Sequence, residues 1–182
     1  MSSVFANTSS VTVLQGEYRV STSPSVMFTT VLGSCISACL YDSESGVGGM
    51  NHFLLPSTSV EDAKNARYGV HAMELLINGV LKKGAIRSQL RAKVFGGAKM
   101  SVNLSDIGLS NADFIQRFLR DEGISCVSSS VGGTSARRVR FHPVTGNAQQ
   151  TRVENDRRLG DQERAAAKPA PAKEDVGAVM LF

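Results

Sequence analysis

The sequence predicts a single mixed α/β domain, and three observations support this fold class. Several short segments place apolar residues at every second position between Gly, Pro and Ser turn signals, as strands do. Two other segments repeat apolar residues every three or four positions, as amphipathic helices do. The chain has 182 residues, which allows one domain with a sizeable core, and a second full domain is not expected.

Strands are expected along most of the domain. They are predicted over residues 11–20, 26–32, 88–97 and 124–131. One hairpin is predicted to pair residues 35–41 with 47–55 through the turn "DSESG", and a second to cover residues 137–153 and turn at "PVTGN". In "CISACLY" small or polar residues alternate with apolar ones, which predicts a strand with two different faces.

Two helices are expected between the strands. The first covers residues 61–83 and places five apolar side chains on one face: Ala66, Val70, Met73, Ile77 and Val80. Thr58 and Glu61 offer a capping box at its start. The second helix covers residues 112–123, with Ser110 or Asn111 as its N-cap.

Composition and charge exclude several classes of protein. Hydrophobic residues make up 42% and charged residues 20%, which indicates a globular protein, and no apolar run is long enough to span a bilayer. The start "MSSVFANTSS" lacks the features of a signal peptide, so we expect a cytoplasmic location. The net charge is +4, and the basic residues form no stripe with interleaved aromatics, so nucleic-acid binding is not favoured.

The composition changes near residue 154, so we expect a folded domain over residues 1–153 and a tail over residues 154–182. The tail is charged and rich in Ala and Pro, and it lacks a core pattern, which is typical of a mobile linker. It ends on the apolar "VGAVMLF". This tip is either a frayed end or a segment that docks on the domain or on a partner.

The three cysteines, Cys35, Cys39 and Cys126, cannot all pair within one chain, and their spacing fits no zinc motif. Cys39 is interpreted as structural, and Cys126 as a core residue. A metal site of Cys35, Cys39 and His52 would lack a fourth ligand, so no metal and no other cofactor is expected. Cys35 is either a small core residue or a reactive thiol.

The hairpin around Cys35 predicts a neighbour for it. If the turn is centred near Ser43 and Glu44, residues whose numbers sum to 87 face each other, and Cys35 lies opposite His52. Directly opposed residues have Cβ atoms about 4.5–5.5 Å apart, close enough for a thiol and an imidazole to share a hydrogen bond. A shift of one residue in register would separate the two side chains.

A thiol beside an imidazole is the arrangement that nucleophilic catalysis requires. The imidazole removes the thiol proton and can then protonate a leaving amine. Thr29 is the hydroxyl expected to orient His52, and Thr30 is expected on the opposite face. The turn at Gly33 and Ser34 presents backbone N–H groups near the sulfur, as an oxyanion hole requires. The alternative remains that Cys35 and His52 are ordinary buried residues.

An ordered series of short motifs runs through about residues 11–153. They are "GEY" at Gly16–Tyr18, Thr29 before "LGSC" at Leu32–Cys35, His52 before Leu55 and Pro56, Tyr68 in the first helix, "KVFGGAKM" at Lys93–Met100, "IGLSN" at Ile107–Asn111, Gly132 and Gly133 before Arg137 and Arg138, and Phe141–Gly146. In these motifs the chain resembles the CheD family, the chemoreceptor glutamine deamidases of bacterial chemotaxis.

The resemblance implies a layered α/β sandwich with mostly antiparallel or mixed strands and two main helices. It also implies a hydrolase in which Cys35 is the nucleophile, His52 the general base and acid, and Thr29 the residue that orients the histidine. The reaction would convert receptor glutamines to glutamate through a thioester and release ammonia, and the same site could cleave glutamyl methyl esters. Tyr68, Arg137 and Arg138 are candidates for substrate binding.

The partners that the resemblance implies are the cytoplasmic helices of chemoreceptors and a CheC-type phosphatase. One alternative is a regulatory binding module for such a phosphatase or for a receptor, with little turnover. Another is a thiol hydrolase of small amides, which would need a deep enclosed pocket rather than an open groove. Ala136 departs from the family, which usually has glycine there, and alanine would strain the loop if that position needed a positive φ.

Overall fold

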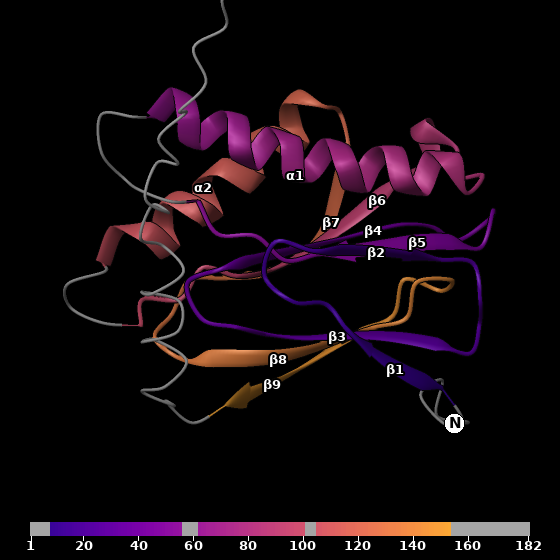
Figure 1. The fold of residues 1–182 in the computed structure, drawn as a ribbon, viewed down its shortest axis with the longest axis horizontal. Coiled ribbons are helices and arrows are strands. Elements are labelled where there is room, and N and C mark those ends of the chain that lie inside the picture. The colour runs from indigo at the N-terminus through magenta and orange to yellow at the C-terminus, as the bar shows by residue number, and fades with distance from the viewer. Residues whose placement is uncertain (1–7, 56–61, 101–104, 154–182) are drawn as a thin grey trace, which may run out of the picture.

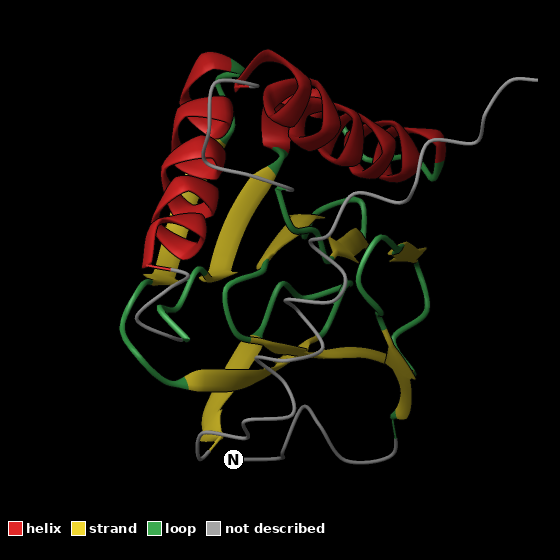
Figure 2. Cartoon of the chain, turned by 60° about the vertical axis from the view of Figure 1, so that its left-hand side comes forward, coloured by secondary structure: helices red, strands yellow, loops and turns green. Residues whose placement is uncertain are grey.

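The computed structural model describes residues 8–55, 62–100 and 105–153, and these form three layers (Figure 1). The outer layer is a four-stranded sheet of, in spatial order, β1 (Ser9–Thr12), β3 (Val26–Leu32), β8 (Ala136–Phe141) and β9 (Ala148–Val153). The middle layer is a five-stranded sheet of β2 (Tyr18–Ser21), β5 (Val47–Asn51), β4 (Ile36–Asp42), β6 (Arg91–Gly96) and β7 (Ser125–Val131). Helices α1 (Asp62–Lys82) and α2 (Ser105–Asp121) cover the far face of that sheet (Figure 2), and a single 3-10 turn, η1 (Arg87–Gln89), precedes β6.

The predicted fold class is confirmed, because the structure is a layered α/β sandwich with two main helices. The strands pair antiparallel except for β1 with β3 and β6 with β7, which are parallel. In the part of the chain that the structure describes, no helix is long and apolar enough to cross a membrane. The predicted tail, 154–182, lies outside the described residues.

Strand β4 is the centre of the molecule and is buried along its whole length. Its alternating pattern places Ile36, Ala38 and Leu40 in the core beneath the helices. Cys35, just before the strand, and Cys39 face the other way, into the core between the two sheets. The two faces expected from the sequence are therefore present, and Cys35 points toward the four-stranded sheet.

Helix α2 begins seven residues earlier than predicted, at Ser105 instead of residue 112. The sequence did not indicate this first part of the helix, because glycine at position 108 is unfavourable within a helix. A Cβ at Gly108 would come within 2.6 Å of the carbonyl oxygen of Ala98, so the residue is needed where the helix meets the loop after β6. Asn111 consequently lies within the helix and is not its cap. The predicted capping box at Thr58 and Glu61 lies outside the described residues.

Residues 11–20 form two strands in different sheets, and not the single strand expected. β1 ends at Thr12, and a turn over residues 14–17 carries the chain to β2 in the other sheet. The turn is closed by the amide of Glu17, which donates to the carbonyl of Leu14, and Gly16 adopts a φ of +84°. A positive φ at the third residue of a turn favours glycine, so Gly16 permits the change of sheet.

The hairpin of β4 and β5 has a register two residues away from the predicted one. Asp42 pairs with Val47 and Cys39 with Met50, so opposed residue numbers sum to 89 and not 87. The side chain of Asp42 causes the difference, because its Oδ1 accepts hydrogen bonds from the amides of Glu44 and Ser45 and holds a four-residue loop. Its Oδ2 also accepts from the amide of Ile86.

The hydrogen bonds to Asp42 predict a pH dependence of stability. Burial of the carboxylate tends to raise its pKa, but the bonds from Ile86, Ser45 and Glu44 outweigh this and leave the pKa below the usual value. A depressed pKa stabilises the fold above about pH 4, and the contribution is lost as pH falls through the folded-state pKa. In urea unfolding, Asp42→Asn should lower stability at pH 7 by about 1–3 kcal/mol and flatten the acid decline. An unchanged acid decline in Asp42→Asn would contradict this role.

Candidate active site

Cys35 and His52 lie on the same face of the β4–β5 pair, although they are not directly opposed. The isolated bridge between Ile36 and Phe53 extends the hairpin register, so Leu54 lies opposite Cys35. His52 is therefore the diagonal neighbour of Cys35, and such pairs have Cβ atoms roughly 7 Å apart or less. A shift of two residues preserves the face, so the direct opposition that was predicted is wrong, but both side chains still lie on one face of the hairpin. Cys35 is fully buried and His52 is 7% exposed.

The hydrogen bonds of His52 decide which ring nitrogen carries the proton. The hydroxyl of Thr30 donates to the carbonyl of Val13 at 2.8 Å, so its single proton is used there. The same oxygen lies 2.8 Å from Nδ1 of His52 and must accept from it. Nδ1 also faces the Val13 carbonyl at 3.4 Å, which can only accept. Neutral His52 is therefore protonated on Nδ1, and the buried Nε2 carries the lone pair.

The hydroxyl that contacts His52 belongs to Thr30 and not to Thr29, contrary to the sequence prediction. Thr30 is 2% exposed and faces the core between the sheets. Thr29 points to the other face of β3, where its hydroxyl donates to the carbonyl of Val139 on β8 at 3.1 Å. Consecutive residues of a strand point to opposite faces, so the two threonines cannot exchange these contacts.

The turn before Cys35 is held by its carbonyl groups. Gly33 accepts from the amide of Ala98 and Cys35 from the amide of Gly97, both at 2.8 Å. Ser34 accepts from Nδ2 of Asn111 at 3.0 Å. Because a peptide group is planar and trans, these bonds aim the amides of Ser34 and Cys35 away from β6 and α2.

Asn111 connects two arms of the candidate site, the turn before Cys35 and the segment after His52. Its Nδ2 donates to Ser34, next to the cysteine, and its Oδ1 accepts from the amide of Leu55, three residues after the histidine, at 2.8 Å. The residue is fully buried. One side chain on α2 therefore fixes the turn before Cys35 relative to the segment that follows His52.

Gln15 contacts the thiol of Cys35. The thiol of Cys35 donates to Oε1 of Gln15 at 3.5 Å, within hydrogen-bond range for sulfur. Gln15 lies in the turn between β1 and β2, whose backbone is bound to His52 on both sides. The amide of Gly16 donates to the His52 carbonyl at 2.7 Å, and the amide of His52 donates to the Glu17 carbonyl at 3.0 Å.

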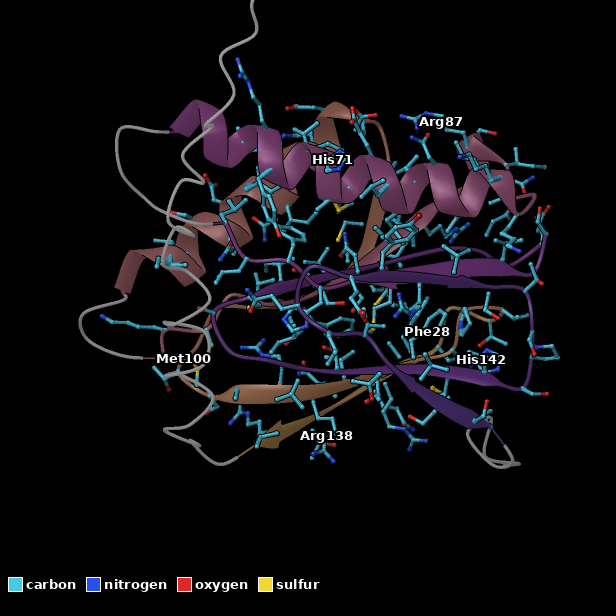
Figure 3. All side chains as sticks on the ribbon, in the orientation of Figure 1. Phe28, His71, Arg87, Met100, Arg138 and His142 are labelled. Carbon is cyan, nitrogen blue, oxygen red and sulfur yellow. The ribbon has the colours of Figure 1, made fainter. Side chains whose placement is uncertain are left out.

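A small cavity of about 60 Å³ lies beside His52. Its walls come from the turn after β1 and from α1, and they include Gly16, Tyr18, Tyr68 and His71. Tyr68, a predicted substrate-binding residue, is 41% exposed at this place. His71 was not connected with His52 in the sequence analysis. Figure 3 shows His71 on α1 above the five-stranded sheet.

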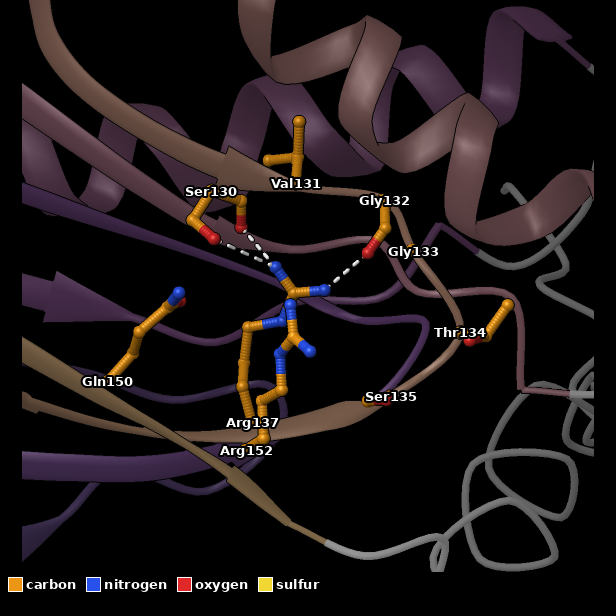
Figure 4. Close-up of a pocket in the computed structure, with 9 residues that line it drawn as sticks. All are labelled: Ser130, Val131, Gly132, Gly133, Thr134, Ser135, Arg137, Gln150 and Arg152. Atoms are coloured by element: carbon orange, nitrogen blue, oxygen red, sulfur yellow. Dashed lines mark hydrogen bonds between the residues drawn. The ribbon is translucent and has the colours of Figure 1, made fainter.

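Arg137 lines a larger cavity of about 280 Å³. Figure 4 shows the side chain of Arg137 next to that of Arg152. The two arginines are directly opposed on β8 and β9. The Arg137 guanidinium is mostly buried and donates to Ser130 and to the carbonyl of Gly132. Burial and the charge of Arg152 lower the pKa of Arg137. Within residues 8–55, 62–100 and 105–153, no ion pair joins either arginine to a carboxylate.

Arg138 and Ala136, on either side of Arg137, have different surroundings. Arg138 is exposed and projects away from the five-stranded sheet (Figure 3), so it does not line the cavity with Arg137. Ala136 is the first residue of β8 and is buried in extended backbone. The alanine that departs from the family pattern therefore occupies a strand position, where no positive φ is needed.

The other two cysteines have different surroundings. Cys39 is fully buried, and desolvation raises the pKa of its thiol to about 12, so it stays protonated at neutral pH. Cys126 is exposed on β7, an edge strand, and the prediction that it belongs to the core was wrong. Among the residues that the structure describes, no three His, Cys, Asp or Glu side chains are grouped to hold a metal ion.

Comparison with known proteins identifies the family. The family model described as "CheD chemotactic sensory transduction" matches residues 54–152, more than half of the chain. The chain belongs to the CheD family. The predicted resemblance is confirmed, and the matched residues include α1, α2 and the strands from β6 to β9.

Relatives in the CheD family extend the match to the N-terminal strands. A protein of Ruegeria sp. (strain TM1040), named probable chemoreceptor glutamine deamidase CheD 1, is 69% identical, with all of both chains covered. A Caulobacter vibrioides protein named probable chemoreceptor glutamine deamidase CheD is 56% identical over 94% of this chain and 92% of its own. Among solved structures, a Neisseria meningitidis protein of family DUF152 reaches a TM-score of 0.47 at 10% identity, over 70% of this chain and 65% of its own, which adds nothing to the assignment.

Sequence reasoning missed four residues at these sites: Thr30, Asn111, Gln15 and Arg152. Two of them carried a usable signal. Asn111 ends the "IGLSN" motif. Arg152 lies opposite Arg137 when the strands of the second hairpin are paired outward from its turn. Thr30 and Gln15 carried none, because the contact of Thr30 joins the two sheets and that of Gln15 joins a turn to a distant part of the chain.

Proposed function

We propose that the chain is a chemoreceptor glutamine deamidase that acts through a thioester on Cys35. The observation that supports this most directly is the state of His52. Its protonated Nδ1 is held by Thr30, which leaves Nε2 as a base on the face that Cys35 shares. A thiol and an oriented neutral imidazole make an activated nucleophile. The relatives named above carry the corresponding activity in their names.

In this mechanism Nε2 of His52 takes the thiol proton, and the Cys35 sulfur attacks the amide carbon of the substrate glutamine. The carbonyl electron pair moves to oxygen, and the amides of Ser34 and Cys35 donate hydrogen bonds to this oxyanion. The imidazolium protonates the departing nitrogen and ammonia leaves. Water, deprotonated by His52, then hydrolyses the thioester to glutamate and restores the thiol.

A methyl ester of glutamate would react by the same steps, with methanol as the leaving group. The alternative, a binding module for a receptor or a CheC-type phosphatase, gives no reason for the tautomer of His52 to be fixed. We therefore favour the enzyme. We place it in the cytoplasm, where the signalling helices of chemoreceptors lie, and propose residues 1–153 as the catalytic domain.

The arginine cavity is proposed to receive an acidic side chain of the receptor helix. The two positive charges side by side repel each other, and a carboxylate between them would relieve this repulsion. The cavity lies near the nucleophile, because Gly132 is bonded to Gly96 and the neighbouring Gly97 to Cys35. Each of these hydrogen bonds joins neighbouring strands, so the two together span roughly 10 Å, about two turns of a substrate helix. Tyr68 is proposed to contact the same helix beside His52.

The first experiment incubates receptor cytoplasmic fragments with wild-type protein, Cys35→Ala or His52→Ala, and follows ammonia and site-resolved mass spectra. Wild type should convert particular glutamines to glutamate, and both variants should lose the activity by about 1000-fold or more. Intact glutamines after incubation with a wild-type protein that still binds the fragments would favour the binding module.

The two threonines provide a matched pair of variants. Thr30→Val should lower kcat by about 10-fold or more and shift the pH profile of kcat, because the imidazole loses the acceptor that fixes its tautomer. Thr29→Val, one residue away on the opposite face, should keep both near wild type. Equal losses in the two variants would mean that the hydroxyls matter only for packing.

The arginine cavity is tested by Arg152→Gln, with Arg138→Gln as the control on the outer face of the same sheet. Arg152→Gln should raise KM for an acidic receptor fragment by about two- to fivefold, leave kcat near wild type and weaken the effect of salt on KM. The proposal fails if the control raises KM as much as Arg152→Gln does.

A further inference from the structure

Gln15 places a carboxamide on the nucleophile of a protein proposed to act on carboxamides. The side chain is exposed, yet its Oε1 accepts from the buried Cys35 thiol at 3.5 Å. We propose that Gln15 occupies the subsite for the substrate carboxamide, so that each substrate glutamine must displace it. This inference rests on the proposed function, because it equates the group of Gln15 with the group that reacts.

The backbone around Gln15 allows displacement without loop opening. The turn is bound to His52 through Gly16 and Glu17, and Val13 just before it donates to the carbonyl of Thr29 at 2.9 Å. The backbone of the turn therefore stays in place when the side chain leaves. A glutamine side chain has three rotatable bonds, and exposed side chains change rotamer within nanoseconds. Uncovering Cys35 then requires only rotation of one side chain.

The same geometry explains why Gln15 is a plug and not a substrate. In the observed contact the amide oxygen accepts the thiol proton, so the oxygen and not the carbon faces the sulfur. Attack requires the carbon to face the sulfur while the oxygen points to backbone donors. The anchored turn opposes that reorientation, so residue 15 should remain glutamine in the purified protein.

Competition by Gln15 also makes the site selective. A hydrogen bond of this kind shifts the balance between covered and uncovered forms by about two- to tenfold, and the apparent substrate affinity falls by the same factor. A substrate glutamine that makes no other contact binds little better than the Gln15 carboxamide it must displace. A glutamine on a helix that also contacts the neighbouring protein surface gains enough binding free energy to displace Gln15. The site therefore disfavours small amides.

The test measures alkylation of Cys35 by iodoacetamide, which needs no deamidase activity, so it can fail independently of the proposed function. Full-length wild type, Gln15→Ala and Leu14→Ala are compared by peptide mass spectrometry. Leu14 is 60% exposed in the same turn and serves as the control. Gln15→Ala should label Cys35 about two- to tenfold faster, Leu14→Ala at the wild-type rate, and KM for a receptor fragment should fall in Gln15→Ala with little change in kcat.

Two further measurements on the same peptide digests are the labelling of Cys39 and the mass of residue 15. Cys39, fully buried, should stay unlabelled. If Cys39 is alkylated together with Cys35, Gln15→Ala has loosened the fold. Gln15→Ser, which also lacks the carboxamide, is then measured instead and is again required to leave Cys39 unlabelled. Unchanged Cys35 labelling in the folded variant overturns the proposal, and so does conversion of residue 15 to glutamate in wild type but not in Cys35→Ala.

Discussion

The hydrogen bond between Thr30 and His52 is the contact on which the proposed chemistry depends, and it joins the two sheets. Thr30 belongs to β3 of the four-stranded sheet, and His52 follows β5 of the five-stranded sheet. The bond forms only when the sheets pack at the right distance and orientation. Neither sheet alone could fix the imidazole, so the sandwich architecture itself determines which nitrogen of His52 carries the proton.

The sequence was informative about elements and less so about contacts between them. Strand β3 and helix α1 were predicted to within a residue, because β3 is a short apolar run after the break at Ser23 and Pro24 and the apolar period of α1 is regular. The hairpin register was predicted two residues away from its true value, since the bonds of Asp42 to its own loop cannot be read from periodicity. The prediction still placed Cys35 and His52 on one face, because the period of a strand is two.

The prediction that Thr29, and not Thr30, contacts His52 was wrong for a different reason. Strand β3 carries large apolar residues on both faces, with Phe28 and Leu32 on one and Met27 on the other, and all three are buried. A period-two pattern cannot identify the inner face when both faces are apolar. Contacts such as that of Gln15 with Cys35 were also beyond prediction, since they join a turn to a distant part of the chain.

The two bonds of Asn111 set the spacing of two arms, the turn before Cys35 and the segment after His52, through one planar carboxamide. The two atoms that make these bonds are held at a fixed separation by covalent geometry, which barely changes on heating. A small domain also unfolds cooperatively, so its core stays packed until the transition. The two arms should therefore keep their separation on warming until α2 detaches from the sheet. Loss of alignment and loss of that helix would then be a single thermal event.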